Sequence, residues 1–195
     1  MSIVLLDEVI INNQIFKRNS PPIGQGTFGI IYKYERDNDI VLGNIYNNLD
    51  MLRPLGKAKE IIIKYEKKDN KGDIGAIKDT KNILNILKNG KCGEHFSNFG
   101  IYTHNEKKYI IMEKAPLGDL NYFINDILII RKEKSLEDHD YWKKIHIQLL
   151  TILNCLKQNY ENKIIDEKNY SRFQDYKEKN ILVYGTIDNP ELKLG

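Results

Sequence analysis

The 195-residue sequence has only two cysteines and one tryptophan, and neither sign of charge dominates. Cys92 and Cys155 lie far apart, and neither has a C-x-x-C or C-x-x-H spacing, so nothing indicates a cysteine scaffold, a zinc site or redox chemistry. We expect both to be buried thiols in a reducing compartment. No stretch approaches the roughly 18 apolar residues of a membrane span, and the apolar start breaks at Asp7, too early for a signal peptide. These absences predict a soluble, cytoplasmic protein.

Charge indicates no particular class of partner. Thirty Lys and Arg residues balance 27 Asp and Glu residues, which leaves a net charge of +3, far from the basic stripe of a nucleic-acid-binding protein. A chain of this length can bury roughly 70% of its unfolded surface, so we expect one globular domain or two small lobes. Ile, Asn, Lys and Tyr are abundant, as in proteins of some A/T-rich large DNA viruses, and we give this bias no functional weight.

Two kinds of pattern divide the chain. From residue 1 to about 113, short runs rich in Ile, Val, Tyr and Phe alternate with turn residues and predict strands, with one helix near 74–89. From about 119 to 158 the apolar residues recur with the helical period and predict two helices. Residues 180–184 and 191–194 then predict a pair of strands.

The break at Pro116-Leu-Gly118 is the natural boundary between these halves. It predicts a first lobe over 1–115 and a second over 116–195. Two polar segments, about 36–58 and 159–172, are expected to be surface insertions.

A glycine-rich stretch at 23–31, IGQGTFGII, is the first motif that indicates chemistry. Gly24, Gly26 and Gly29 form G-x-G-x-x-G, whose backbone N–H groups can approach phosphate oxygens closely. A dinucleotide-binding turn places a helix after this pattern, but residues 30–35 predict a strand. A glycine loop between two strands is typical of the flap that covers ATP in protein kinases. The alternative is a glycine-rich hairpin without a ligand.

The following segment, IIIK at 61–64, resembles the V-A-I-K strand of protein kinases. The resemblance implies that Lys64 contacts the α- and β-phosphates of ATP, and it places Ile23 and Ile31 beside the nucleotide as well. Taken alone, a lysine after an apolar run is more often a solvated strand end.

Residues 109–120, YIIMEKAPLGDL, resemble the hinge of the same family. By this resemblance Met112 would be the gatekeeper, and the backbone at Glu113 and Ala115 would hold the adenine edge. Asp119 would accept a hydrogen bond from the ribose. Its alternative role is to cap the helix predicted to begin there, and both roles can coexist.

The most specific motif is FQDYKEKNILV at 173–183, which is similar to the catalytic loop H-R-D-x-K-x-x-N-I-L-V. The resemblance implies that Asp175 accepts the proton of the attacking hydroxyl and that Asn180 holds Mg²⁺. In this family a lysine two places after the aspartate, here Lys177, is typical of kinases that act on Ser and Thr. It would stabilise charge on the transferred phosphoryl group. Each residue alone could be an ordinary surface charge.

From the glycine loop to its last residue the chain thus resembles eukaryotic-type protein kinases. The resemblance implies an α+β fold, with an antiparallel small lobe carrying one helix and a partial, mostly helical large lobe. It implies ATP and Mg²⁺ as cofactors, transfer of the γ-phosphoryl group to Ser or Thr of a protein substrate, and no nucleic-acid or membrane partner. If the gene is viral, the compartment would be the host cytoplasm.

Four positions depart from the family pattern. Phe173 and Gln174 replace the His and Arg of H-R-D, which argues against regulation by activation-loop phosphorylation. Thr80 stands where a glutamate normally pairs with the phosphate-binding lysine, and Asp79 is a poor substitute because it is shorter and at a different helical angle. Ile62 replaces the small residue above adenine and is expected to narrow that pocket.

The sequence ends at Gly195, at the position where D-F-G begins in the family. The D-F-G aspartate would be the main Mg²⁺ ligand, so we expect phosphoryl transfer by these residues alone to be weak or absent. We also expect an exposed apolar face on the helix near 139–158. Two alternatives follow: a pseudokinase or truncated kinase acting as a binding module, and one half of a split kinase completed by another polypeptide.

Overall fold

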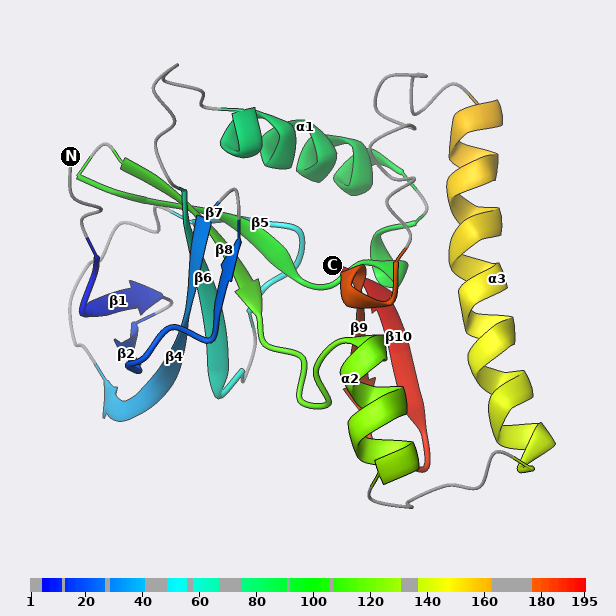
Figure 1. Ribbon diagram of the computed structural model, residues 1–195. Coiled ribbons are helices and arrows are strands. Elements are labelled where there is room, and N and C mark those ends of the chain that lie inside the picture. The colour runs from blue at the N-terminus through cyan, green and yellow to red at the C-terminus, as the bar shows by residue number, and fades with distance from the viewer. Residues whose placement is uncertain are drawn as a thin grey trace. The chain divides into compact units, whose positions relative to one another are not determined.

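The computed structural model describes residues 5–11, 13–26, 29–40, 49–55, 58–66, 75–90, 92–105, 107–130, 137–162 and 177–195. In these residues the fold is α+β, with antiparallel strands and few helices (Figure 1). The chain forms two compact units. The first contains Met1–Asn85 and Asn98–Lys114, and the second contains Ile86–Ser97 and Ala115–Gly195.

The first unit is built on one antiparallel sheet with the strand order β1-β2-β4-β6-β8-β7-β5, and β3 pairs with β4. Its strands are β1 (Glu8–Ile11), β2 (Gln14–Arg18), β3 (Gly24–Gly26), β4 (Gly29–Ile40), β5 (Leu49–Met51), β6 (Glu60–Glu66), β7 (Phe99–His104) and β8 (Lys107–Glu113). Helix α1 (Gly75–Asn89) follows β6, which confirms the helix predicted near 74–89.

Alternation of side chains fixes which face of each strand is buried. In β6, Ile61, Ile63 and Tyr65 are buried, whereas Ile62 and Lys64 are half-buried. Each fully buried isoleucine contributes about 1.5–3 kcal/mol relative to an exposed one. The core of the first unit consists of Leu6, Val9, Ile11, Phe16, Tyr32, Tyr34, Leu55, Ile61, Ile63, Tyr65, Tyr102, Tyr109 and Ile111.

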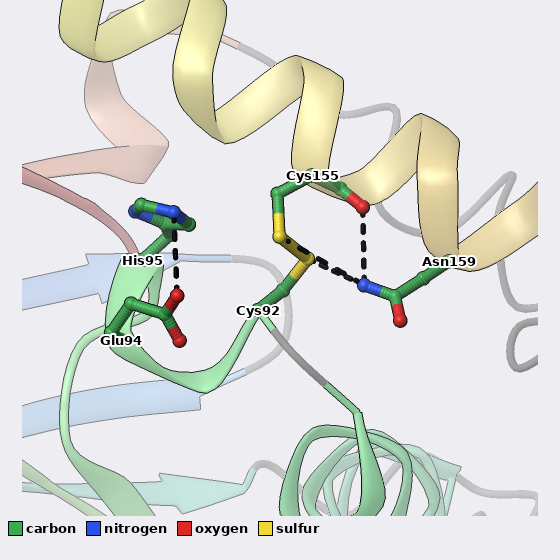
Figure 2. The surroundings of a disulfide bond; sticks show 5 residues. All are labelled: Cys92, Glu94, His95, Cys155 and Asn159. Carbon is green, nitrogen blue, oxygen red and sulfur yellow. Dashed lines mark hydrogen bonds and ion pairs between the residues drawn. A yellow bond between two sulfur atoms is a disulfide. The ribbon is translucent and has the colours of Figure 1, made fainter.

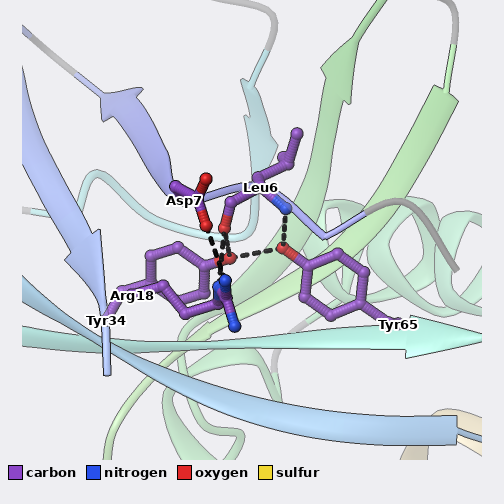
Figure 3. Close-up of polar contacts among 5 residues, drawn as sticks. All are labelled: Leu6, Asp7, Arg18, Tyr34 and Tyr65. Atoms are coloured by element: carbon purple, nitrogen blue, oxygen red, sulfur yellow. Dashed lines mark hydrogen bonds and ion pairs between the residues drawn. The ribbon is translucent and has the colours of Figure 1, made fainter. Parts of the chain in front are cut away.

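A polar cluster ties the segment before β1 to this core (Figure 3). The Tyr34 hydroxyl donates to the carbonyl of Leu6 at 2.5 Å, and the Tyr65 hydroxyl accepts from the Leu6 N–H at 3.0 Å. The two hydroxyls also contact each other. Arg18 Nε donates to the same carbonyl at 3.2 Å and its guanidinium pairs with Asp7. Burial raises the pKa of both tyrosines, so the hydroxyls remain protonated donors.

The second unit contains the expected helices and strand pair. Helix α2 (Leu120–Tyr122) continues as a π-helical segment, η2 (Phe123–Ile130), and α3 spans His139–Glu161. Short 3₁₀ turns occur at η1 (Gly93–His95) and η3 (Glu178–Asn180). Strands β9 (Ile181–Gly185) and β10 (Pro190–Leu194) form an antiparallel hairpin.

Side chains of helix α3 attach it to the β9–β10 hairpin, and the Tyr141 hydroxyl donates to the Ile187 carbonyl in its turn at 2.7 Å. The side chain of Gln148 donates to the Pro190 carbonyl and accepts from the Leu192 N–H, both at 2.9 Å. Asp138 caps the helix by accepting from the Tyr141 N–H at 3.1 Å.

The opposite side of α3 exposes large apolar side chains. Ile147, Leu150 and Leu153 have 52%, 58% and 40% of their surface accessible. The exposed apolar face predicted for this helix is confirmed only in part, because Leu153 is exposed whereas Ile145, Ile152 and Leu156 are buried. In the part of the chain that the structure describes, no helix is both long and apolar enough to cross a membrane.

Two expectations are corrected. Cys92 and Cys155 are joined in a disulfide, so the prediction of two thiols is wrong. The sequence separation of 63 residues hides this pairing, because only the folded chain brings the two together. The insertion predicted at 36–58 is partly wrong as well, because β4 extends to Ile40 along β2 and β5 pairs with β7. Residues 41–48 and 163–172 of the predicted insertions lie outside the described residues.

Candidate functional site

One face of the three central strands of the first unit collects residues from three sequence motifs. Residues directly opposite each other in antiparallel strands project to the same face. Ile31 on β4 lies opposite Lys64 on β6, and Ile62 on β6 lies opposite Met112 on β8. All four are half-buried, and we call them the Lys64 face. The opposite face of the same strands forms the buried core.

The glycine motif forms a hairpin at this face. Gly24 pairs with Ile31 and Gly26 with Gly29, and the Ile23 N–H donates to the Ile31 carbonyl at 2.9 Å. Ile23 itself is exposed, and residues 27–28 at the tip lie outside the described residues. The strand predicted at 30–35 is confirmed as part of β4. Because a strand follows the last glycine, the arrangement differs from a dinucleotide-binding turn, which leads into a helix.

Packing explains one glycine of the motif and not another. A Cβ atom on Gly29 would lie 2.5 Å from the Tyr65 carbonyl oxygen and 3.4 Å from Cε of Lys64. The sheet itself therefore requires glycine at this position. At Gly24 the nearest contact of a Cβ would be an ordinary one, 3.7 Å from Cδ1 of Ile31. Packing therefore does not require glycine at Gly24.

Backbone hydrogen bonds fix the end of β8. The Glu113 N–H donates to the Asn98 carbonyl at 2.8 Å, and the Lys114 N–H donates to the Glu60 carbonyl at 3.2 Å. Ala115, which follows, is buried. The binding of adenine by this segment stays a prediction.

The carboxylate of Glu60 adds side-chain contacts at the end of β8. Glu60 accepts hydrogen bonds from Lys114 at 2.8 Å and from Lys33 at 2.9 Å, and Lys33 also pairs with Glu35 at 2.5 Å. Burial alone would raise the pKa of Glu60, but the hydrogen bonds from the two lysines outweigh it and the pKa is lowered. The pairs with Glu35 and Glu60 raise the pKa of Lys33. Sequence reasoning missed this cluster, because only the strand register shows that Glu35 and Glu60 lie opposite each other.

Asp119 is a helix cap in the second unit. Its side chain accepts a hydrogen bond from the Tyr122 N–H at 2.9 Å, and its backbone is extended. The alternative role predicted for this residue is therefore confirmed. Its contact with a ribose stays a prediction.

The catalytic-loop motif is described only in its second half. Lys177 is exposed and precedes η3, and the Asn180 N–H donates to its carbonyl at 2.8 Å. Asn180 is half-buried, and its own carbonyl accepts from the Gly195 N–H at 2.8 Å. Asp175 lies outside the described residues, so its position relative to Asn180 stays a prediction. On α1, Thr80 is half-buried.

The described residues do not build a magnesium site by themselves. In the described ranges, no group of three or more His, Cys, Asp and Glu side chains could hold a metal ion. Asn180 supplies one amide oxygen, whereas Mg²⁺ in phosphoryl-transfer sites is held by carboxylates together with the phosphates of the substrate. Asn180 therefore stays a predicted ligand whose partners would have to include the phosphates themselves.

Neither models of known protein families nor the curated proteins provide a match to this chain. The function must therefore be inferred from the geometry and chemistry of its own residues.

Proposed function

We propose that this chain binds ATP and transfers its γ-phosphoryl group to Ser or Thr hydroxyls of a protein, with a kinase-like fold. The observation that supports the proposal most is the Lys64 face. Ile31, Lys64 and Met112 come from three separate motifs, and strand pairing places all three on one face. An accidental likeness of short sequences would not require this coincidence in space.

Phosphoryl transfer depends mainly on positioned charge and little on covalent chemistry of the protein. Lys64 neutralises charge on the α- and β-phosphates, while backbone N–H groups at Gly24 and Gly26 donate to phosphate oxygens. Asp175 accepts the proton of the substrate hydroxyl while the oxygen of that hydroxyl forms a bond to the γ-phosphorus. The bond between that phosphorus and the bridging oxygen breaks, and ADP leaves with the electron pair. Lys177 stabilises the charge on the transferred group.

Calorimetric titration with ATP and with adenosine tests the role of Lys64. Lys64→Met should weaken ATP binding about 10- to 100-fold, because a hydrogen bond to a charged group contributes roughly 1.5–3 kcal/mol. Adenosine, which has no phosphates, should bind both proteins equally. Lys108→Met, which removes the same charge from an exposed position of β8, is the matched control and should leave both affinities unchanged. Equal ATP affinity of all three proteins, or no binding at all, would refute the proposal.

A second role is a binding module without phosphoryl transfer, either as a pseudokinase or as half of a split kinase. The exposed side chains of Ile147, Leu150 and Leu153 on α3 favour it, because a row of large apolar side chains on a helix is typical of a protein contact. Transfer from radiolabelled ATP by wild type and Asp175→Asn separates the two roles. If wild type binds ATP but transfers no more phosphate than Asp175→Asn does, the binding module is favoured.

A further inference from the structure

The disulfide of the second unit joins two elements that are distant in sequence (Figure 2). Cys92 precedes η1 and Cys155 lies on α3, with their Cα atoms 5.8 Å apart. They are the only cysteines of the chain, so no third thiol can exchange with them intramolecularly. Any opening of the bond by thiol exchange therefore requires an external thiol.

Beyond the disulfide, the segment that contains Cys92 is attached to β10. The short turn Gly93–His95 has no buried residue. Just after it, Phe96 forms a bridge with Leu194 of β10, and the Ser97 N–H donates to the Leu194 carbonyl at 2.8 Å. The disulfide therefore attaches the start of this segment to α3, and β10 holds its end.

The two sulfur atoms lie in different surroundings. Cys92 is 1% exposed, whereas Cys155 is half-buried. Asn159, itself buried, donates through Nδ2 to the Cys155 carbonyl at 3.1 Å and to the Sγ atom of Cys92, whereas the Sγ atom of Cys155 lies farther from the same nitrogen, at 4.0 Å. An N–H donor beside a sulfur stabilises its thiolate form. Cys92 is accordingly the better leaving group, and Cys155, the less buried of the two residues, is the expected point of attack.

We propose that the Cys92–Cys155 bond is a redox-responsive tie, opened by small thiols such as glutathione in a fixed direction. A glutathione thiolate attacks Sγ of Cys155, the disulfide breaks, and Cys92 leaves as a thiolate that accepts the hydrogen bond from Asn159. A second glutathione thiolate attacks the glutathione sulfur of the mixed disulfide, which releases glutathione disulfide and the Cys155 thiolate. Glutathione disulfide reverses both steps. Opening frees Cys92 and η1 from α3, while Phe96 and Ser97 stay attached to β10.

The test follows the full chain in buffers of reduced and oxidised glutathione, with alkylation of free thiols and peptide mass spectrometry. The mixed disulfide trapped early should lie on Cys155. In the reduced protein, amide exchange should accelerate at 93–95, where the His95 N–H donates to the Cys92 carbonyl at 3.0 Å in the structure, and remain slow at Ser97. An adduct mainly on Cys92, or equal exchange in both forms, would overturn the proposal.

A second experiment tests whether Asn159 promotes the departure of Cys92 as a thiolate. Asn159→Asp keeps the size of the side chain but replaces the donor with a carboxylate that repels a thiolate, so the rate of opening should fall by about tenfold. Gln158→Glu makes the same change at the neighbouring exposed position of α3 and should open at the wild-type rate. Equal rates in all three proteins would refute the role of Asn159. The mapping of the adduct on the unmodified chain decides the proposal even where Asn159→Asp fails to fold.

Discussion

At the scale of single residues, the glycine motif divides into a position required by packing and one that is not. A Cβ at Gly29 would clash with the Tyr65 carbonyl oxygen, a backbone contact that a side-chain rotation cannot relieve. The corresponding contact at Gly24 is with the end of the Ile31 side chain and lies at an ordinary distance. Packing therefore requires glycine at position 29 but not at position 24.

Replacement of Gly29 by alanine should lower stability, whereas replacement of Gly24 by alanine should lower the affinity for ATP. Gly29→Ala should lower the free energy of unfolding by about 1–3 kcal/mol, the usual cost of overpacking. Gly24→Ala should leave it within about 0.5 kcal/mol of wild type and weaken ATP binding, because the methyl group occupies space next to the phosphates. Urea denaturation and ATP titration measure the two effects. A stable Gly29→Ala protein, or a Gly24→Ala protein with unchanged ATP affinity, would contradict this division.

The sequence predicted the motif residues but not their partners. Gly24, Lys64 and Met112 could be named because they stand in motifs that resemble those of protein kinases, and their roles stay predictions. The ion pairs of Glu60 were not recognisable, because Lys33 and Lys114 reach it only through the strand register. Residue type and spacing carry local information, whereas pairing between strands depends on the whole sheet.

At the scale of elements, Glu60 connects the beginning of β6 with β4 and with the end of β8. Its pKa is lowered in the folded protein, so the folded state binds its proton more weakly than the unfolded state does. The resulting stabilisation is fully present above the unfolded pKa, near 4.3, and is lost as the pH falls through the lower folded pKa.

Glu60→Gln should therefore cost stability at neutral pH and very little in acid. The expected difference in the free energy of unfolding at pH 7 is at most about 1 kcal/mol, because the pair is partly exposed. The difference from wild type should shrink as the pH falls below about 4. Urea denaturation of both proteins from pH 3 to 7 measures it. A difference that is constant over this range would show that the carboxylate charge is not the cause.

The elements themselves were predictable where apolar residues repeat with a clear period. Helices α1 and α3 and the β9–β10 hairpin agree with the prediction. The second half of β4 was missed because its residues are largely polar, and β5 because it has only three residues. Both become strands by pairing with β2 and β7. Tertiary pairing there overrides local propensity.

At the scale of the whole molecule, residues from distant parts of the sequence come together separately in each unit. In the first unit, strand pairing places three motifs on the Lys64 face. In the second unit, folding joins Cys92 to Cys155. The order of the motifs made the first arrangement predictable, whereas nothing in the spacing of two isolated cysteines predicted the second.

In the proposed complex, the phosphates of ATP lie at Lys64. An acyl phosphate derivative of ATP transfers its acyl group to a lysine next to the bound phosphates, and peptide mass spectrometry then identifies that lysine. We predict that Lys64 is the main labelled residue, that excess ATP prevents its labelling, and that exposed Lys108 is labelled only weakly and without protection by ATP. Labelling spread over the exposed lysines, with no protection of Lys64 by ATP, would contradict the account.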